Sequence, residues 1–283
     1  MNAQIGLQAY SVREQWDKDI IGTLERLAAI GYKNLELAVA NDGGDILTGG
    51  LTADKLRIQL DRLGMKAVST HVYPLDNDNW DRIIAFNETV GSTAIVYPIH
   101  FFSSLRDVQD LSCNMNKWGE ICRNNDMDFY FHNHFHEFQP MDGQTIMDRL
   151  LNTTDENLVK IELDTYWALR GGVDPIEYLR KLGSRCDLLH QKDIPATTNP
   201  VNMFEILRKD EIITEERFSE LWKVDDFTEI GDGVMNIRDI LDEVRKLGFA
   251  KYVFVEQDMT RMPALDSVER SYMNFSKLWQ MAD

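Results

Sequence analysis

The chain has 283 residues, 43% of them hydrophobic, and its 47 acidic residues outnumber 30 basic ones, giving a net charge of −17. This length and composition fit one large α/β domain or two average domains with a sizeable core. The negative charge repels phosphate backbones and anionic lipids, so we expect neither nucleic acid nor a membrane as a partner.

Cysteine use and the N-terminal residues indicate the compartment. Cys113, Cys122 and Cys186 lie far apart and form no C-x-x-C pair, so neither a zinc ribbon nor a disulfide framework is indicated. The first residues, MNAQIGLQAYSVREQ, have no basic stretch followed by an apolar core, and no run of about 18 apolar residues occurs. We expect a cytoplasmic protein. The sequence does not decide the oligomeric state, and a homo-oligomer is compatible with it.

One local pattern occurs five times along the chain. A helical stretch ends at a glycine, and a short apolar run begins about three residues later, at 27–38, 60–70, 87–98, 179–190 and 244–256. Glycine suits the left-handed residue that ends a helix. The apolar run is too short for a helix and suits a strand buried on both faces.

Hydrophobic spacing predicts eight strands that alternate with eight helices. The strands are expected near 5–9, 34–38, 66–71, 94–99, 128–132, 159–163, 186–190 and 252–256. The helices are expected near 23–30, 52–63, 78–90, 104–124, 142–152, 174–182, 236–247 and 265–281. This alternation indicates a parallel sheet, and eight units in a chain of this size predict one closed (β/α)8 TIM barrel over residues 1–283.

An open doubly wound sheet is the competing fold. It usually carries G-x-G-x-x-G after its first strand. Here the first strand leads into Tyr10-Ser11-Val12-Arg13, and the one G-x-G, at 231–233, comes late and lacks the third glycine. The barrel is therefore favoured. Its longest connection lies between the seventh and eighth strands, where a long loop serves most often as a lid or a partner contact.

The carboxyl ends of the strands are where such barrels carry their chemistry. All six histidines lie at these ends or just beyond them. The polar and aromatic residues found there, in chain order, are Gln8, Tyr10, Glu36, His71, His100, His132, Asn133, His134, Glu137, Asp164, Trp167, His190, Lys192, Asp193, Glu256 and Asp258.

Three of these residues indicate a metal site. Asp164, His190 and Glu256 each follow an apolar run typical of a buried strand. Three converging buried ionisable groups are costly unless something compensates them, and a divalent cation would do so. We expect one ion per chain. Ligation by oxygen and imidazole is compatible with Mn²⁺, Co²⁺, Mg²⁺ or Zn²⁺, and the sequence does not choose between them.

Five stretches together resemble one family. They are GLQAYSVRE at the first strand, ELDTYWALRGGVDPIEYL at the sixth, LLHQKD at the seventh, EIGDGVMNI before the last helices and VEQD at the eighth. The chain is similar, nearly end to end, to the xylose-isomerase-like sugar isomerase/epimerase barrels. The resemblance implies that a carboxylate of the fifth strand, Asp164, His190 and Glu256 bind the metal.

The fifth strand departs from the family pattern. Epimerases of this family carry a glutamate within that strand, whereas DFYFHNH offers no carboxylate between Asp128 and Glu137. Either Glu137 reaches back from the following loop, or a histidine takes the position. We favour Glu137. The stretch FHNHFHEF would then supply one metal ligand and several imidazoles around the substrate.

The expected reaction starts with removal of a proton next to a metal-polarised carbonyl. We predict a sugar or keto-sugar isomerase/epimerase, with a lyase or dehydratase on a 3-keto-glycoside or inosose as the alternative. A DNA-repair nuclease or a non-catalytic sugar-binding barrel fits less well. Phosphate on the substrate is disfavoured, because neither a glycine-rich cradle nor paired arginines follow the late strands. The expected catalytic residues are Glu256, His134 and Lys192; the expected substrate-binding residues are Gln8, Tyr10, His71, His100, His132, Asn133 and Trp167.

Overall fold

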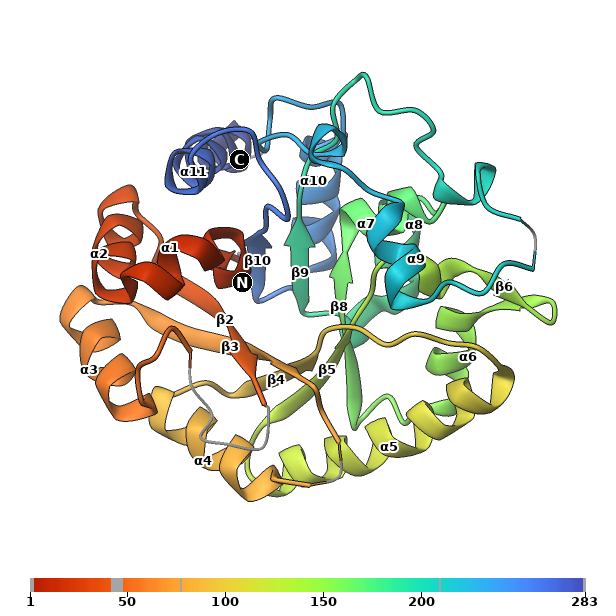
Figure 1. Cartoon of the computed structure of the whole chain (residues 1–283), viewed down its shortest axis with the longest axis horizontal. Coiled ribbons are helices and arrows are strands. Elements are labelled where there is room, and N and C mark those ends of the chain that lie inside the picture. The colour runs from red at the N-terminus through yellow and green to blue at the C-terminus, as the bar shows by residue number, and fades with distance from the viewer. Residues whose placement is uncertain (1–2, 42–47, 77, 209, 282–283) are drawn as a thin grey trace.

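The fold is a closed barrel of eight parallel strands surrounded by helices (Figure 1). The computed structural model describes residues 3–41, 48–76, 78–208 and 210–281. Around the barrel the strands follow the order β1-β10-β9-β8-β5-β4-β3-β2, so chain neighbours pair and the last strand closes on the first. The predicted (β/α)8 fold is confirmed.

The strands lie close to their predicted positions. They are β1 (Gln4–Gln8), β2 (Asn34–Ala40), β3 (Lys66–Tyr73), β4 (Ala94–Tyr97), β5 (Asp128–His132), β8 (Val159–Asp164), β9 (Leu188–Gln191) and β10 (Tyr252–Val255). The main outer helices are α2 (Ile20–Ile30), α3 (Ala53–Leu63), α4 (Trp80–Val90), α5 (Leu105–Asn124), α6 (Ile146–Thr153), α8 (Pro175–Leu182), α10 (Ile237–Leu247) and α11 (Ala264–Met281). Three further short helices, α1 (Arg13–Lys18), α7 (Thr165–Arg170) and α9 (Glu215–Glu220), were not predicted.

The start of α6 differs from its prediction. A helix was expected from residue 142, but 140–145 form a hairpin of β6 (Pro140–Met141) and β7 (Gln144–Thr145). Asp142 and Gly143 both have positive φ, which makes the turn. The Thr145 hydroxyl then accepts a hydrogen bond from the Asp148 N–H and caps the helix.

Glycines end the outer helices as predicted. Gly64, Gly91 and Gly248 follow α3, α4 and α10 in the left-handed region, and each donates its N–H to a carbonyl of the last turn. Each chain reversal returns the backbone to the amino end of the next strand.

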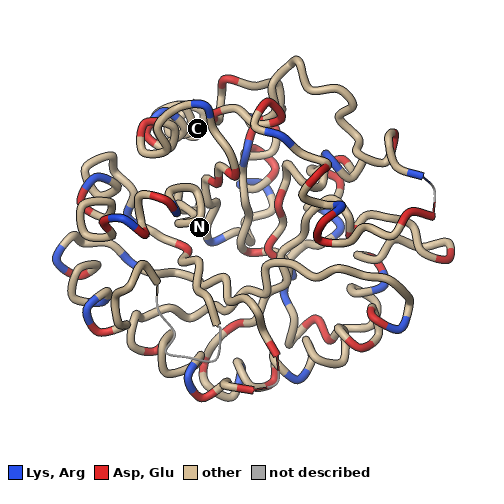
Figure 2. The backbone as a smooth tube through the Cα atoms, in the orientation of Figure 1, with Lys and Arg blue, Asp and Glu red and all other residues tan. Residues whose placement is uncertain are grey.

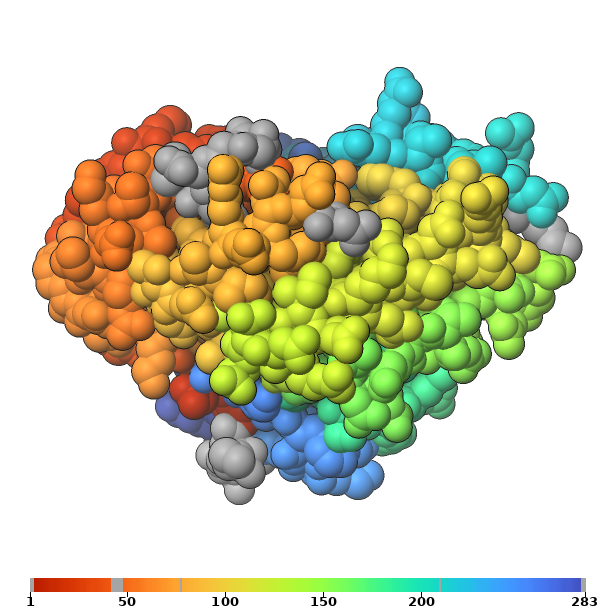
Figure 3. All heavy atoms as spheres, turned by 90° about the horizontal axis from the view of Figure 1, so that it is seen from below, coloured from red at the N-terminus to blue at the C-terminus, as the bar shows by residue number. Residues whose placement is uncertain are grey.

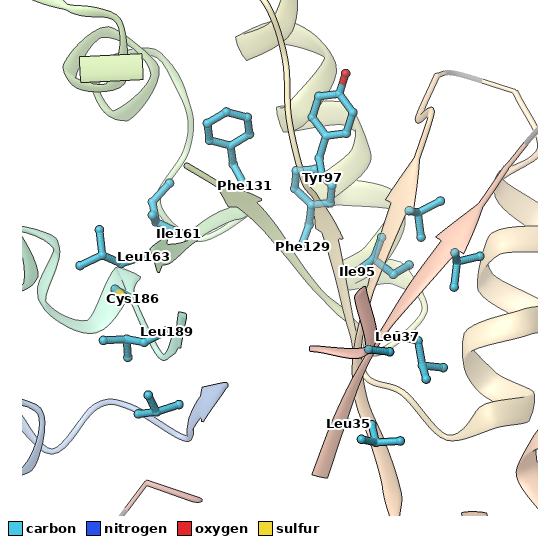
Figure 4. Packing of buried hydrophobic residues seen from close by; sticks show 14 of the residues in the cluster. Leu35, Leu37, Ile95, Tyr97, Phe129, Phe131, Ile161, Leu163, Cys186 and Leu189 are labelled. Carbon is cyan, nitrogen blue, oxygen red and sulfur yellow. The ribbon is translucent and has the colours of Figure 1, made fainter. Parts of the chain in front are cut away.

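Strand alternation divides the buried side chains into two layers. One set, including Leu35, Leu37, Ile161 and Leu189, belongs to the core that also contains the buried residues of the outer helices (Figure 4). Residues at the alternate strand positions, whose side chains point to the other face, form a smaller cluster. It consists of Ala94, Val96, Tyr130, Leu188 and Phe254. Because the residues of one parity share one face of a strand, this second face also carries Glu36, Glu162 and His190.

One glycine makes room inside the barrel. A Cβ on Gly6 would lie 2.4 Å from the ring of Phe254, which is wholly buried in the small interior cluster. Any larger residue at position 6 would therefore displace the ring that fills the middle of the barrel.

The long connection between β9 and α10 covers part of the carboxyl end of the barrel. Its residues Phe218 and Phe227 join Phe135, Tyr166 and Trp167 in a second hydrophobic cluster. Phe218, on α9, lies 5.8 Å from Phe101 between ring centroids. Figure 3 shows this segment, in cyan, against the yellow residues that follow β4.

Charged residues are spread over the outer layer. In Figure 2 the Lys and Arg residues are interspersed with Asp and Glu along the outer helices and loops. In the described part of the chain, no helix combines the length and apolarity needed to cross a membrane.

Candidate active site and metal centre

A cluster of buried ionisable residues occupies the carboxyl end of the barrel. Strand register explains the convergence, because Asp164 pairs with His190, His132 with Glu162, and Glu36 with Gln8. The cluster, all of it buried, comprises Glu36, His71, His132, Glu162, Asp164, His190, Lys192, Glu256 and Asp258.

Glu36 is held by hydrogen bonds on both oxygens. Its Oε1 accepts from the Ser69 hydroxyl at 2.6 Å, and its Oε2 accepts from the Gln8 amide at 2.8 Å and contacts His190 Nε2 at 2.5 Å. Burial would raise the pKa of Glu36, but His71 and His190 outweigh it and hold that pKa below its usual value. Glu36 is therefore an ionised residue that fixes the neighbouring imidazoles.

His71 lies between two glutamates. Its Nε2 is 2.7 Å from Glu162 Oε2 and 3.1 Å from Glu36 Oε2. Burial alone would lower the pKa of His71, but the two carboxylates outweigh it and raise the pKa to about 9. The second oxygen of Glu162, Oε1, is buried without a hydrogen-bond partner.

Four donors fit a divalent ion. One ligand atom from each of His132, Asp164, His190 and Glu256 lies within 4.8 Å of all the others. His190 Nδ1 is 2.7 Å from Glu256 Oε2, and His132 Nε2 is 3.9 Å from Asp164 Oδ2. Two imidazoles and two carboxylates match the donors that Mn²⁺, Co²⁺ or Zn²⁺ accepts.

The far ring nitrogens of the two histidines support this assignment. His190 Nε2 contacts Glu36, and His132 Nδ1 lies 3.2 Å from Glu162 Oε2. A metal-binding histidine usually donates its other N–H to a carboxylate, which fixes its tautomer and orientation. A second set of donors, His71, His132, Glu162 and His190, also lies within 4.8 Å. In that set, Glu162 would be a ligand and would no longer serve only as an orienting partner.

Lys192 places a positive charge beside the four donors. Its Nζ is 2.6 Å from Asp164 Oδ2, 2.8 Å from Glu256 Oε2 and 3.1 Å from Asp258 Oδ2. Burial would lower the pKa of Lys192, but Asp164, Asp258 and Glu256 raise it well above its usual value. The pocket between Asp164 and Glu256 therefore accommodates a cation, and a bound metal ion would share these carboxylates with the ammonium group.

The backbone around Asp164 fixes the direction of its carboxylate. Asp164 Oδ1 accepts from the Trp167 N–H at 2.8 Å and so caps α7. The Asn133 amide bridges the two strands, accepting from the Asp164 N–H at 3.0 Å and donating to its carbonyl at 3.3 Å. Asp164 Oδ2 is left to face Lys192 and the metal donors.

A cavity of about 470 Å³ opens above the cluster. Its lining includes five ionisable residues, His71, His132, His134, Glu256 and Asp258. Apolar and aromatic residues complete the wall, namely Tyr10, Ala38, Val39, Ala40, Tyr73, Pro98, Ile99, Trp167, Phe218 and Trp222. A concave site of this size with a few convergent polar groups is typical of small-molecule binding.

Two cavity residues are suited to proton transfer. Burial, with His136 adding to it, lowers the pKa of His134 well below its ordinary value, so its imidazole is neutral and able to accept a proton. Burial raises the pKa of Asp258 to about 7, against the opposing effect of Lys192. A neutral imidazole and a carboxyl group that is partly protonated near pH 7 form a base and an acid in one cavity.

Several predicted site residues lie at the cavity or in the cluster beneath it. Tyr10, His71, His132, His134, Trp167 and Glu256 line the cavity, and Asp164, His190 and Lys192 lie in the cluster. Gln8 and Asn133, predicted to bind substrate, are fully buried and bonded to Glu36 and Asp164. Both are placed to position the cluster.

Two residues lie away from the places predicted for them, Glu137 from the metal donors and His100 from the cavity above them. Glu137 belongs to neither donor set; its Oε2 accepts from the His134 N–H, its Oε1 lies 3.2 Å from His136 Nε2, and burial raises its pKa to about 8. His100 lines a separate cavity and contacts the Tyr97 hydroxyl at 3.1 Å. The fifth-strand residue among the donors is His132.

Sequence reasoning missed the roles of two residues. Glu36 was noted only as a strand end, and Glu162 was not singled out. Both sit between apolar residues, in LEL and IEL, and Glu162 shares the parity of Asp164 two residues later. That parity is the signal that places both carboxylates inside the barrel.

The fold and the site define a parallel (β/α)8 barrel with a set of metal-type ligands at the carboxyl end of its strands. The chain belongs to the xylose isomerase-like TIM barrel family, whose sequence profile matches residues 24–272. The resemblance seen in the sequence is thereby confirmed.

Curated relatives of the chain are named inosose dehydratase. Those from Geobacillus kaustophilus and Clostridium beijerinckii are each 27% identical over 150 residues. The first match covers 53% of this chain and 45% of the relative, and the second covers 52% and 46%. The chain thus spans about half the length of the curated relatives it matches.

Solved structures match over nearly the whole chain. A sugar phosphate isomerase/epimerase from Parabacteroides distasonis is 25% identical, with a TM-score of 0.75, over 96% of this chain and 93% of that one. A probable 3-DHS dehydratase from Bacillus anthracis is 14% identical, with a TM-score of 0.68, over 96% of this chain and 98% of that one. The second likeness shows the fold alone.

Proposed function

We propose that the protein is a metal-dependent lyase that removes a β-substituent from a keto-sugar or cyclitol ketone. The naming of the curated relatives as dehydratases supports an elimination. The proposal reverses the order expected from the sequence, which placed an isomerase or epimerase first.

The asymmetry of the cavity carries this proposal. His71 and His132 come from β3 and β5, with His134 just beyond, whereas Glu256 and Asp258 follow β10. In the barrel, β10 lies three strands away from both β3 and β5, so imidazoles and carboxylates face each other. Elimination needs a base for the C–H proton and an acid for the leaving group. Among the described lining residues, carboxylates come only from the β10 end, without the opposed pair that suits epimerisation.

Each ionisable residue of the site then has a role in the elimination. A divalent ion held by His132, Asp164, His190 and Glu256 would polarise the ketone as the neighbouring proton leaves. His134 takes that proton on its neutral imidazole. Asp258 donates a proton to the departing oxygen, and Lys192 holds Asp164, Glu256 and Asp258 in place through three ion pairs. Glu36 and Glu162 orient the ligand imidazoles.

The substrate is proposed to be unphosphorylated. No Lys or Arg occurs among the described residues that line the cavity, and Glu256 and Asp258 add negative charge there. A phosphate group would find no Lys or Arg side chain in this lining to pair with. The aromatic residues of the lining instead suit the apolar face of a sugar ring.

Isomerisation or epimerisation is the second candidate function. It is favoured by the likeness to the sugar phosphate isomerase/epimerase from P. distasonis, which aligns with nearly the whole chain. In this case His134 and Asp258 would each serve as acid and base on opposite faces of the same carbon.

A reaction in D₂O separates the two functions. The lyase consumes a 3-keto-glycoside or inosose and releases the leaving group or water. An isomerase returns a sugar of unchanged composition that carries solvent deuterium. We expect release, slowed roughly 10²–10⁴-fold by His134→Ala with the metal retained. Deuterium wash-in without release, untouched by His134→Ala, would reject the lyase.

A further inference from the structure

The cavity is larger than the reacting ring requires. A six-carbon ring ketone with twelve heavy atoms needs at most about 360 Å³, even at the ~30 Å³ per heavy atom of liquid water. Covalently bonded atoms pack more tightly still. The cavity of about 470 Å³ therefore holds the ring and leaves room for a further group.

The aromatic residues that line this cavity, which we call the aromatic wall, are Tyr10, Tyr73, Trp167, Phe218 and Trp222. Tyr10 and Tyr73 are 40% and 42% exposed, although large aromatic side chains are usually covered. Both rings are therefore partly accessible to a ligand, with the Arg13 guanidinium 4.1 Å from the centroid of the Tyr10 ring. Trp167 connects the wall to the cluster, because Lys192 Nζ lies 5.4 Å from its ring centroid.

Phe218 and Trp222 of the aromatic wall are held in place by neighbouring rings. Phe218 stacks on Phe135 at 5.4 Å and contacts Trp167 at 5.7 Å, and Trp222 lies 6.2 Å from Trp167. The neighbouring ring of Phe227 supports Trp222 at 5.6 Å. The wall is thus held in place by packing before any ligand arrives.

We propose that the aromatic wall binds the leaving group of the substrate, a flat apolar aglycone attached to a sugar ring. This inference rests on the proposed lyase function. With the carbonyl at C3 of the ring, the proton at C2 is acidic and the aglycone oxygen at C1 is the β-substituent. Removal of the C2 proton sends its electron pair into a C1=C2 double bond, and the C1–O bond breaks toward oxygen.

This elimination is balanced in atoms and electrons without an added oxidant. The C2 proton goes to the base, the aglycone oxygen takes a proton from the acid, and an unsaturated 3-keto sugar and a free alcohol result. The reaction that supplies such a substrate must oxidise the C3 alcohol of an intact glycoside.

Paired substrates test the assignment. Methyl and benzyl 3-keto-β-glucosides have alkoxide leaving groups of similar reactivity but different size. We expect the wild-type holoenzyme to prefer benzyl about tenfold or more in kcat/KM, because the ring buries apolar area against Trp222. Trp222→Ala should remove this preference, so that its kcat/KM values for the benzyl and methyl substrates differ by less than about twofold. Phe249→Ala, at an exposed aromatic residue outside the cavity lining, is the matched control and should change neither.

Two further measurements cover the cases in which Trp222→Ala folds poorly or the lyase function fails. Trp222→Leu, which retains apolar volume, should show an intermediate preference if Trp222→Ala folds poorly. If neither substrate is eliminated, the same two compounds become stable ligands, and calorimetry gives their Kd values directly. A benzyl preference in Kd that Trp222→Ala abolishes would support the aglycone site even though the lyase function had failed. Equal wild-type values for methyl and benzyl, or tighter binding of a 3-keto disaccharide, would overturn the inference.

Discussion

The two ends of the barrel each carry a cluster of charged residues, and only one of the clusters is balanced. At the amino end, Lys160 and Lys251 face Asp128 and Asp187, with Nζ–Oδ2 distances from 2.8 to 3.5 Å. The hydroxyl of Tyr130 donates to Asp187 at 2.6 Å. Two positive charges meet two negative ones, and this network needs no ligand.

At the carboxyl end, the charges do not balance without protonated histidines. Five carboxyl groups, those of Glu36, Glu162, Asp164, Glu256 and Asp258, are buried there with one lysine, Lys192, which pairs with the last three. His71 and His190 carry raised pKa values because these carboxylates surround them. The excess of buried negative charge at the carboxyl end marks a site for a further cation and hence a functional site. The amino-end cluster, whose charges are already paired, is structural.

The largest expected effect comes from removing one negative charge at the carboxyl end. Asp164→Asn takes a charged donor from the metal set, so bound metal should fall to background and activity by at least about 10³-fold. Elemental analysis and steady-state kinetics measure both. The matched variant at the amino end, Asp187→Asn, should lower stability but retain the metal. Equal metal loss in the two variants would break the comparison.

The pH dependence of stability should separate the two ends. The pKa of His71 is raised from its ordinary 6.5 to about 9. Its contribution to stability in the chelator-treated protein is therefore complete below pH 6.5 and is lost as the pH rises to about 9, by roughly 3 kcal/mol at most. Burial would raise the pKa of Asp187, but Lys251, Tyr130 and Lys160 lower it, so its contribution is lost as the pH falls below its ordinary 3.8.

Denaturant unfolding across this pH range measures both losses. His71→Gln should flatten the alkaline decline and leave the acid decline unchanged. An alkaline decline that persists unaltered in His71→Gln would show that loss of a proton from His71 is not its cause.

The smallest effect is expected for a lysine of the balanced cluster. Lys160 is 25% exposed in its side chain, so Lys160→Met should cost about 1 kcal/mol or less in the free energy of unfolding. Metal content and kinetics should match the wild type. A changed kcat in this variant would contradict a purely structural role for the amino end.

The fold was predictable because its pattern is local and repeated. Helix-ending glycines and apolar strands occur at regular spacing, and Gly64, Gly91 and Gly248 have the left-handed backbone that their positions predict. The short helix α9 was not predictable in this way. Its position depends on Phe218 packing against Phe101 and Phe135, which come from other connections.

The candidate site was predictable where its ionisable residues stand at the carboxyl ends of strands. Asp164, His190 and Glu256 were named from the sequence, and the structure places their donor atoms together. Glu36 was listed as a strand-end residue but given no role, and Glu162 was not singled out because it lies within its strand, two residues before Asp164. The position of Glu137 depends on the turn at His136–Phe138, which folds its carboxylate back on the His134 N–H.

An anomalous difference map from a crystal grown with Mn²⁺ tests the central claim most directly. The account predicts one strong peak in contact with His132, Asp164, His190 and Glu256, with Glu36 and Glu162 still bonded to the far nitrogens of the two imidazoles. The balanced cluster around Lys160 and Asp187 should show no peak. An empty carboxyl end, or a peak bound directly by Glu162 and His71, would contradict the assignment.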